Sequence, residues 1–160
     1  MMADDFFENH ELSLWIFSYG ISNIILLLLG GGVACFLMVM SIHVLTGELS
    51  AEQFGISLTI VEVLMALAIM VPNVLIIRGK PSALAVNKIM VCVQIASYLL
   101  FAMTFDQENK WFGLAFGVLP FLSLWLMSTP RYRAFIAYHE ALHKDPIGFR
   151  EKLLQRISDS

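Results

Sequence analysis

Long hydrophobic runs alternate with short polar connections along this chain of 160 residues. Four runs are long enough for a membrane-crossing helix, because an α-helix rises about 1.5 Å per residue and about 20 apolar residues cover the hydrocarbon core. They cover residues 21–45, 54–77, 83–104 and 111–127, and the last is the shortest. The pattern therefore predicts an all-α integral membrane protein in which residues 21–128 form a bundle of four transmembrane helices.

The composition agrees with this pattern. Hydrophobic residues make up 58% of the chain and charged residues only 14%, whereas soluble domains contain roughly 45–50% apolar residues and about 25% charged ones. The first twelve residues contain four acids and no Lys or Arg, which is unlike the basic start of a secretory signal peptide. We therefore expect the first span to remain in the mature protein.

The basic residues predict the orientation of these spans. Nine of the ten Lys and Arg residues fall in residues 78–88 and 131–156, and basic flanks are retained on the cytoplasmic side of a membrane. The connection that holds Glu48 and Glu52 has no basic residue, and the other connection on that side has only Lys110. We therefore expect both termini in the cytoplasm and a location in the inner (cytoplasmic) membrane of a bacterium.

The first apolar run begins well before the predicted first span. It starts at Leu12, so a single straight helix over the whole run would overshoot the membrane. We expect residues 1–20 to form an interfacial lead-in, and Gly30, Gly31 and Gly32 to let a neighbouring helix approach closely. A re-entrant break at these glycines is the alternative.

Aromatic residues gather near the predicted ends of the first and fourth spans. Trp and Tyr are enriched at membrane–water interfaces, where an apolar ring carries a polar edge. The residues expected at these interfaces are Trp15, Tyr19, Trp111, Trp125 and Tyr132.

Residues 129–160 form a basic tail. Thr129 before Pro130 predicts one helix start, and Asp145 before Pro146 predicts a second. We expect two short amphipathic helices on the inner leaflet or against a partner protein. The residues expected at this cytoplasmic interface are Arg131, Arg133, Lys144 and Arg150.

The tail also contains the His-Glu-x-x-His pattern of zinc proteases, at His139, Glu140 and His143. Residues four apart share a helix face, so both imidazoles could bind one metal ion. A zinc enzyme also needs a third protein ligand and an open coordination position, yet the residues after His143 include no His or Cys. We therefore predict no enzyme activity, no cofactor and no metal site, with a zinc enzyme and non-catalytic metal binding as the alternatives.

Polar residues recur inside the predicted spans. An ionisable side chain such as Glu62 is costly in a bilayer unless it is neutral, paired or in a wet cavity. Asn73 lies three helical turns further along the same face, and Gln94 and Tyr98 share a stripe of the third span. Together with His43 near the outer end of the first span, these residues predict a series of polar side chains from one side of the membrane to the other, which we call the polar ladder. Interhelical hydrogen bonding is the first interpretation, and a proton or cation path with Glu62 as the titrating group is the second.

Small residues and prolines mark the packing of the later helices. Gly113 and Gly117 are four residues apart near the outer end of the fourth span, and such a face lets two helices approach closely. We expect it to form a contact within the fold rather than a dimer seam. Pro72 and Pro120 predict kinks in the second and fourth helices.

Beyond a location in the membrane, the sequence holds few indications of function. It has no phosphate-binding glycine loop and no serine nucleophile elbow, and no nucleic-acid partner is expected. The layout is similar to that of several kinds of small bacterial membrane protein, including immunity proteins against pore-forming toxins and accessory subunits of larger complexes. We therefore expect this membrane-embedded chain to act by binding another membrane protein or a pore-forming toxin. A small oligomeric channel or transporter that uses Glu62 is the alternative, and self-association stays open.

Cysteine labelling can test the membrane orientation that the distribution of basic residues predicts. Single cysteines at Lys80 and Arg150 should react only with reagents that reach the cytoplasm. Cysteines at Ser50 and Glu108 should react with a membrane-impermeant maleimide added to intact cells. Opposite labelling at any two of these sites would refute the orientation.

Overall fold

The chain is helical throughout the part that the structure describes. The computed structural model describes residue 6 and residues 13–47, 49–105 and 107–158, and it contains no strand in these ranges. The elements are α2 (Leu14–Thr46), α3 (Ala51–Ile77), the short 3-10 helix η1 (Pro81–Ala83), α4 (Leu84–Thr104), α5 (Gln107–Phe116), α6 (Val118–Ser128), α7 (Pro130–Lys144) and α8 (Pro146–Ser158). The prediction of an all-helical chain is confirmed.

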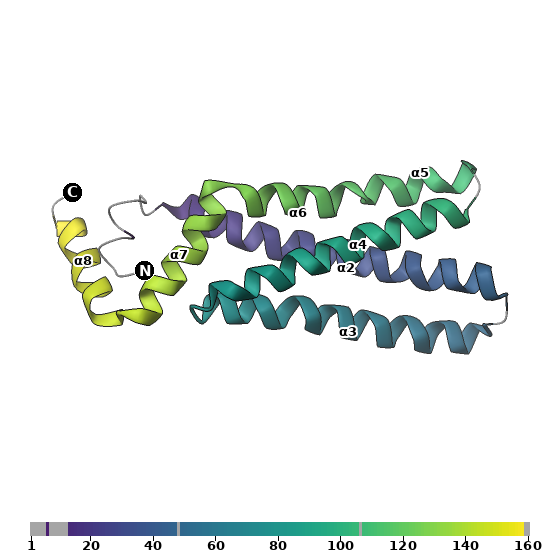
Figure 1. Ribbon diagram of the computed structural model, residues 1–160, viewed down its shortest axis with the longest axis horizontal. Helices are drawn as coiled ribbons and strands as arrows, with labels where there is room; N and C mark the ends of the chain where they lie inside the picture. Colours follow the sequence, from purple (N-terminus) through teal and green to yellow (C-terminus); the bar gives the residue numbers. More distant parts are fainter. Residues whose placement is uncertain (1–5, 7–12, 48, 106, 159–160) are drawn as a thin grey trace.

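The long helices lie side by side, with α2 at the centre (Figure 1). Helix α2 packs against α3, α4, α6 and α7, and we call α2 to α6 the helical body. We call the end of the body where α2 connects to α3 and α4 connects to α5 the turn end. We call the opposite end, where α3 connects to α4 and α7 leaves the body, the tail end. Helix α7 is bent by 63° from the segment Gly113–Ser128.

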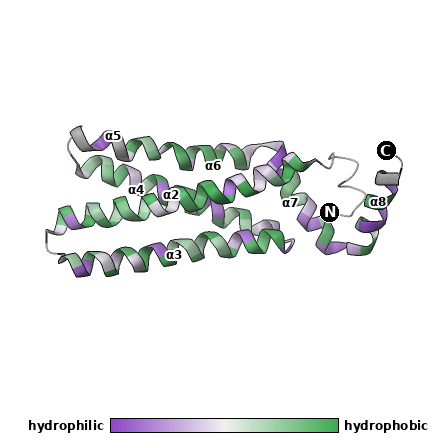
Figure 2. Cartoon of the chain, turned by 180° about the vertical axis from the view of Figure 1, so that it is seen from behind, coloured by the Kyte–Doolittle hydropathy of each residue, from purple (hydrophilic) through white to green (hydrophobic). Residues whose placement is uncertain are grey.

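The apolar helices of the body are long enough to span a membrane, which indicates a membrane protein. Three segments meet the length and hydropathy expected of a span: Leu14–Thr46, Ala51–Ile77 and Pro81–Thr104. The bent pair Gly113–Ser128 and Pro130–Lys144 makes a fourth if it counts as one span. Hydrophobic residues predominate along α2, α3, α4 and α6, whereas α7 and α8 are mixed (Figure 2).

Helix α2 is one continuous helix across the predicted lead-in. The Ser13 side chain caps it by accepting a hydrogen bond from the Trp15 amide at 3.4 Å. The predicted boundary near residue 20 is therefore not a helix boundary, although residues 1–5 and 7–12 lie outside the described part. The helix also continues through Gly30 to Gly32, so the alternative of a break at these glycines is wrong. Glycine keeps its backbone hydrogen bond, and only its propensity for helix is low.

The predicted fourth span consists of two helices. Proline has no amide hydrogen, so Pro120 cannot donate to the carbonyl four residues earlier, at Phe116, and α5 ends at that residue. The Gly117 amide instead donates to the Leu114 carbonyl at 3.0 Å, which tightens the turn. The proline effect was expected as a kink in one helix over residues 111–127, but it separates α5 from α6. Pro72, by contrast, lies inside the unbroken α3.

Helices α3 and α4 are close only at the tail end. There, Ile69 and Ile76 of α3 join Val91 of α4 in the main hydrophobic cluster. Towards the turn end α4 moves away from α3 and approaches α5 (Figure 1), and Phe101 packs with Leu37 of α2. Within the described ranges α3 has no contact with α5. One face of α3 is therefore left uncovered towards the turn end.

The glycines of α2 differ in what surrounds them. A β-carbon at Gly30 would lie 2.8 Å from Oε1 of Gln94, and one at Gly31 would lie 2.9 Å from Cδ1 of Ile69. These two positions therefore do allow close approach of neighbouring helices, as the sequence suggested. A β-carbon at Gly32 would meet nothing within 4 Å, because Gly32 faces the uncovered side.

This difference predicts opposite outcomes for one substitution at two positions. Gly30→Phe should overpack the buried contact with Gln94 and lower the free energy of unfolding by about 1–3 kcal/mol. Gly32→Phe should stay within about 0.5 kcal/mol of the wild type, because its ring meets open space. Thermal unfolding in detergent measures both, and equal destabilisation would contradict the packing described for α2.

Candidate functional site

A pair of buried amides joins α3 to α4 at the tail end. Nδ2 of Asn87 donates to Oδ1 of Asn73 at 3.0 Å, and Nδ2 of Asn73 donates back to Oδ1 of Asn87 at 3.4 Å. Asn73 also donates to the Ile69 carbonyl at 2.7 Å. Both side chains are buried, so each would lose its partner if the helices separated.

Two further residues of the predicted ladder join α4 to α2. Nε2 of Gln94 donates to the Leu27 carbonyl at 2.9 Å, and the Tyr98 hydroxyl donates to the Gly30 carbonyl at 3.3 Å. Both side chains are buried, and within the described part Oε1 of Gln94 accepts no hydrogen bond. Asn73, Gln94 and Tyr98 thus hold helices together, which favours the structural interpretation for these three.

A third polar cluster was missed in the sequence. The Ser123 hydroxyl of α6 donates to Oδ1 of Asn23 at 2.7 Å, and Nδ2 of Asn23 donates to the Tyr132 hydroxyl at 3.2 Å. Tyr132 is only 1% exposed, so its side chain packs inside the protein and not on the outer surface. The available signal was the presence of polar residues inside apolar runs, at Ser22 and Asn23 in the first and at Ser123 in the last.

Glu62 and His43 stand apart from these clusters. The His43 ring lies against Phe54, with 5.9 Å between ring centroids. Phe54 precedes Glu62 by eight residues, about 12 Å along the helix, so His43 lies nearer the turn end than Glu62 does. The Glu62 side chain is exposed, and no hydrogen bond or ion pair involves it among the described residues. The predicted ladder is therefore not continuous.

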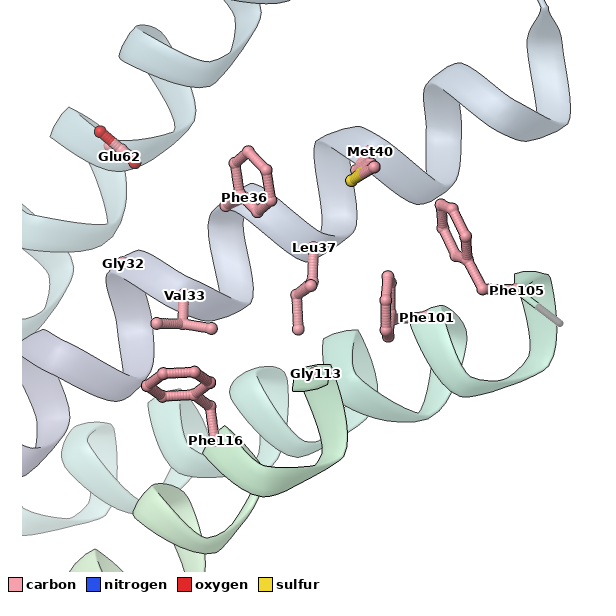
Figure 3. Close-up of a pocket in the computed structure, with 10 residues that line it drawn as sticks. All are labelled: Gly32, Val33, Phe36, Leu37, Met40, Glu62, Phe101, Phe105, Gly113 and Phe116. Atoms are coloured by element: carbon pink, nitrogen blue, oxygen red, sulfur yellow. The ribbon is translucent and has the colours of Figure 1, made fainter. Parts of the chain in front are cut away.

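Glu62 lines a cavity of about 710 Å³, which we call the lateral cleft. The lining residues are Gly32, Val33, Phe36, Leu37 and Met40 of α2, Glu62 of α3, Phe101 and Phe105 of α4, and Gly113 and Phe116 of α5. Helix α2 forms the floor, with Glu62 on one side and the aromatic residues of α4 and α5 on the other (Figure 3). The cleft is thus the uncovered region that the divergence of α3 and α4 creates.

The α3 wall is made of small and polar residues. Ala51, Gly55, Thr59, Glu62 and Ala66 fall on one helix face, since their spacings are four, four, three and four. All five are exposed, and a β-carbon at Gly55 would meet nothing within 4 Å. A shallower hollow of about 420 Å³ runs along the first three of them. We call these five residues the small-residue stripe.

The wall of the cleft opposite Glu62, which α4 and α5 form, is aromatic and tightly packed. The Phe101 and Phe105 rings lie 4.5 Å apart between centroids. Gly113 lies directly against the Phe101 ring, and Gly117 lies near Tyr98. The two glycines of the predicted small-xxx-small face are therefore used within the chain, between α5 and α4.

In the tail, the His-Glu-x-x-His residues are engaged in packing and an ion pair. His139 lies against the Phe135 ring at 4.7 Å between centroids. Gly79, whose φ of 74° suits glycine, places the α3–α4 turn against His143 so closely that a side chain there would collide with it. Glu140 accepts from Nζ of Lys144 at 2.7 Å, and this bond lowers the pKa of the Glu140 carboxyl. The described ranges hold no group of three residues suited to bind a metal.

The expected cytoplasmic basic residues are all on the surface. Arg133, Lys144 and Arg150 are exposed. Arg131 is exposed as well, and its Nη1 donates to the Tyr19 hydroxyl at 3.1 Å while its guanidinium lies 5.2 Å from the centre of that ring. This contact fixes the start of α7 beside α2.

The burial of His139 predicts a pH dependence of the α7 contact. Burial lowers the pKa of His139 below its ordinary value of 6.5, and nearby His143 lowers it further. The unfolded chain therefore takes up a proton more readily than the folded chain, so stability falls as pH drops below about 6.5. Hydrogen–deuterium exchange of α7, corrected for intrinsic rates, should become faster there. His139→Phe should abolish the effect, and an unchanged pH dependence in this variant would contradict the assignment.

Comparison with known proteins finds no matching family model, no matching curated protein and no matching solved structure.

Proposed function

We propose that this chain is a four-span inner-membrane protein, with both termini in the cytoplasm, that binds another membrane protein through the lateral cleft. The observation that carries the proposal is the position of Glu62, which lies exposed on an apolar surface without a partner in the described part of the chain. In this orientation the turn end faces the outside, and the cleft opens within the outer half of the membrane.

The cost of an unpaired carboxyl group favours a bound partner. An acidic residue in a transmembrane helix costs roughly 3 kcal/mol on insertion scales, and such residues usually face other helices or water rather than lipid. The remaining cleft lining gives Glu62 no compensation, because the lining residues are apolar apart from this carboxyl group. A partner that covers the cleft would supply the missing hydrogen bond or charge.

The way in which the chain covers the rest of this α3 face supports a helix as the partner. Asn73 lies eleven residues after Glu62 and therefore on the same face, and there the face is covered by α4 through the amide pair. Around Glu62 the same face is empty. The small-residue stripe also permits close approach of a helix backbone, as in packed membrane helices.

Two roles fit a protein that binds in this way. An immunity protein would capture the helix of a pore-forming toxin, and an accessory subunit would hold a helix of a larger complex. The outward position of the cleft favours the first role, because a toxin that enters from outside reaches this half of the membrane first.

A small channel or transporter is the second candidate, because the cavity holds a titratable group. It is less well supported. The buried polar residues beyond the cleft bind backbone carbonyls or one another, and Glu62 is not joined to them.

Site-specific photo-crosslinking in the native membrane tests the binding proposal. Benzoylphenylalanine in place of Phe36, which lines the cleft, should crosslink to a second protein. The same residue in place of Phe121, which is exposed on α6 outside the cleft, should crosslink to lipid. Gly32→Phe should abolish the protein adduct at Phe36, since its ring would project from the floor into the cleft.

The control for this experiment is thermal unfolding of Gly32→Phe, which should match the wild type. Lipid adducts alone at both positions, or a protein adduct that survives Gly32→Phe, would contradict the proposal.

A further inference from the structure

We infer that the partner presents a single transmembrane helix, with a basic side chain that pairs with Glu62. This inference rests on the proposed function, and it adds the chemistry that selects the partner. The shape of the cleft, the small-residue stripe and the isolated carboxyl group each support one part of it.

The shape supports a helix that lies parallel to α2 and α3. The stripe runs along α3 from Ala51 to Ala66, and these fifteen steps of 1.5 Å span about 22 Å. A separate hollow of about 420 Å³ on the surface of α3, nearer the turn end, is lined by Ala51, Glu52, Gly55, Ile56, Thr59 and Ile60. An exposed helix face of this length matches most of a membrane-crossing helix.

The two walls would contact such a helix in different ways. Gly55 and Thr59 allow its backbone to approach α3 closely, since a β-carbon at Gly55 meets open space. Phe36 on the floor and Phe116 on the aromatic wall would pack against its larger apolar side chains. Small residues on one wall and large ones on the other define the rotation of the bound helix.

The carboxyl group defines what that helix carries. Glu62 lies eleven residues from Ala51, about 16 Å from the turn end of α3. No other acidic residue occurs between Phe54 and Ile77. A Lys or Arg of the partner at this depth would neutralise the carboxylate and donate hydrogen bonds to it, and charge-assisted bonds of this kind are the stronger ones.

Other occupants fit less well. A second copy of the chain docked symmetrically would bring a second Glu62 into the cleft, where like charges repel. A small hydrophobic cation would satisfy the carboxylate and could contact the aromatic rings, but it would leave the stripe at Ala51 and Gly55 uncovered. The helix accounts for both the charge and the stripe.

Binding of synthetic helices to the full-length chain in lipid vesicles tests this inference. The probe is a leucine–alanine helix of about 20 residues with one lysine at the depth of Glu62. The matched controls carry leucine at that position, or the lysine in the opposite half. Energy transfer between labelled chain and labelled helix should show about tenfold tighter binding of the probe than of either control.

Variants at Glu62 separate charge from shape. Glu62→Gln should erase the lysine preference while the thermal unfolding midpoint stays unchanged. Glu62→Lys should reverse the preference in favour of a helix with glutamate. Gly32→Phe should weaken the binding of every helix.

Three outcomes would overturn the inference: equal binding of the lysine and leucine helices, a lysine preference that persists in Glu62→Gln, or binding of tetraphenylphosphonium without binding of any helix. If the Phe36 crosslink forms while lysine confers no preference, the partner chemistry is wrong and the binding function stands. If no protein crosslink forms, the binding function itself fails.

Discussion

The amide pair between Asn73 and Asn87 determines the shape of the helical body. It fixes α3 to α4 at the tail end with two reciprocal hydrogen bonds, and separation of the helices would leave both buried amides unpaired, at a cost of about 1–3 kcal/mol each. No polar contact joins α3 to α4 towards the turn end in the described residues. There α4 instead follows α2 and α5, held by Gln94, Tyr98 and Phe101. The lateral cleft is the consequence of a strong attachment at one end and none at the other.

This arrangement gives one helix face two different environments. On α3, the face that carries Ile69, Asn73 and Ile76 is buried in the core. The same face three turns earlier carries Glu62 and is exposed. If α4 covered this face of α3 along its whole length, the Glu62 carboxyl group would be buried against α4, with no basic residue nearby to compensate its charge. The divergence of α4 avoids that conflict within the chain and leaves the carboxyl group available to a partner.

The hydrophobic pattern was sufficient to predict the helices but not their contacts. The runs around residues 21–45 and 54–77 became α2 and α3 because length and apolar composition act locally. Helix α5 is separate from α6 because Pro120 cannot make one backbone hydrogen bond. The sequence shows the proline, but the position of the break could be assigned only once the helix register was known. The Asn23, Ser123 and Tyr132 cluster joins residues about 100 positions apart, so no local spacing could reveal it. For Glu62, the sequence identified the unusual residue but not whether it faced the core or the cleft.

The His-Glu-x-x-His pattern shows the same limit at the scale of one helix. The spacing does place both imidazoles on one face of α7, as the sequence implied. That face, however, packs on the α3–α4 turn, where Gly79 contacts the segment of His139 and His143, and the intervening Glu140 pairs with Lys144. A catalytic glutamate must instead be free to take a proton from a metal-bound water. In this chain the same residue types secure the position of α7 against the helical body, whereas Glu62 in the cleft has no hydrogen bond or ion pair among the described residues.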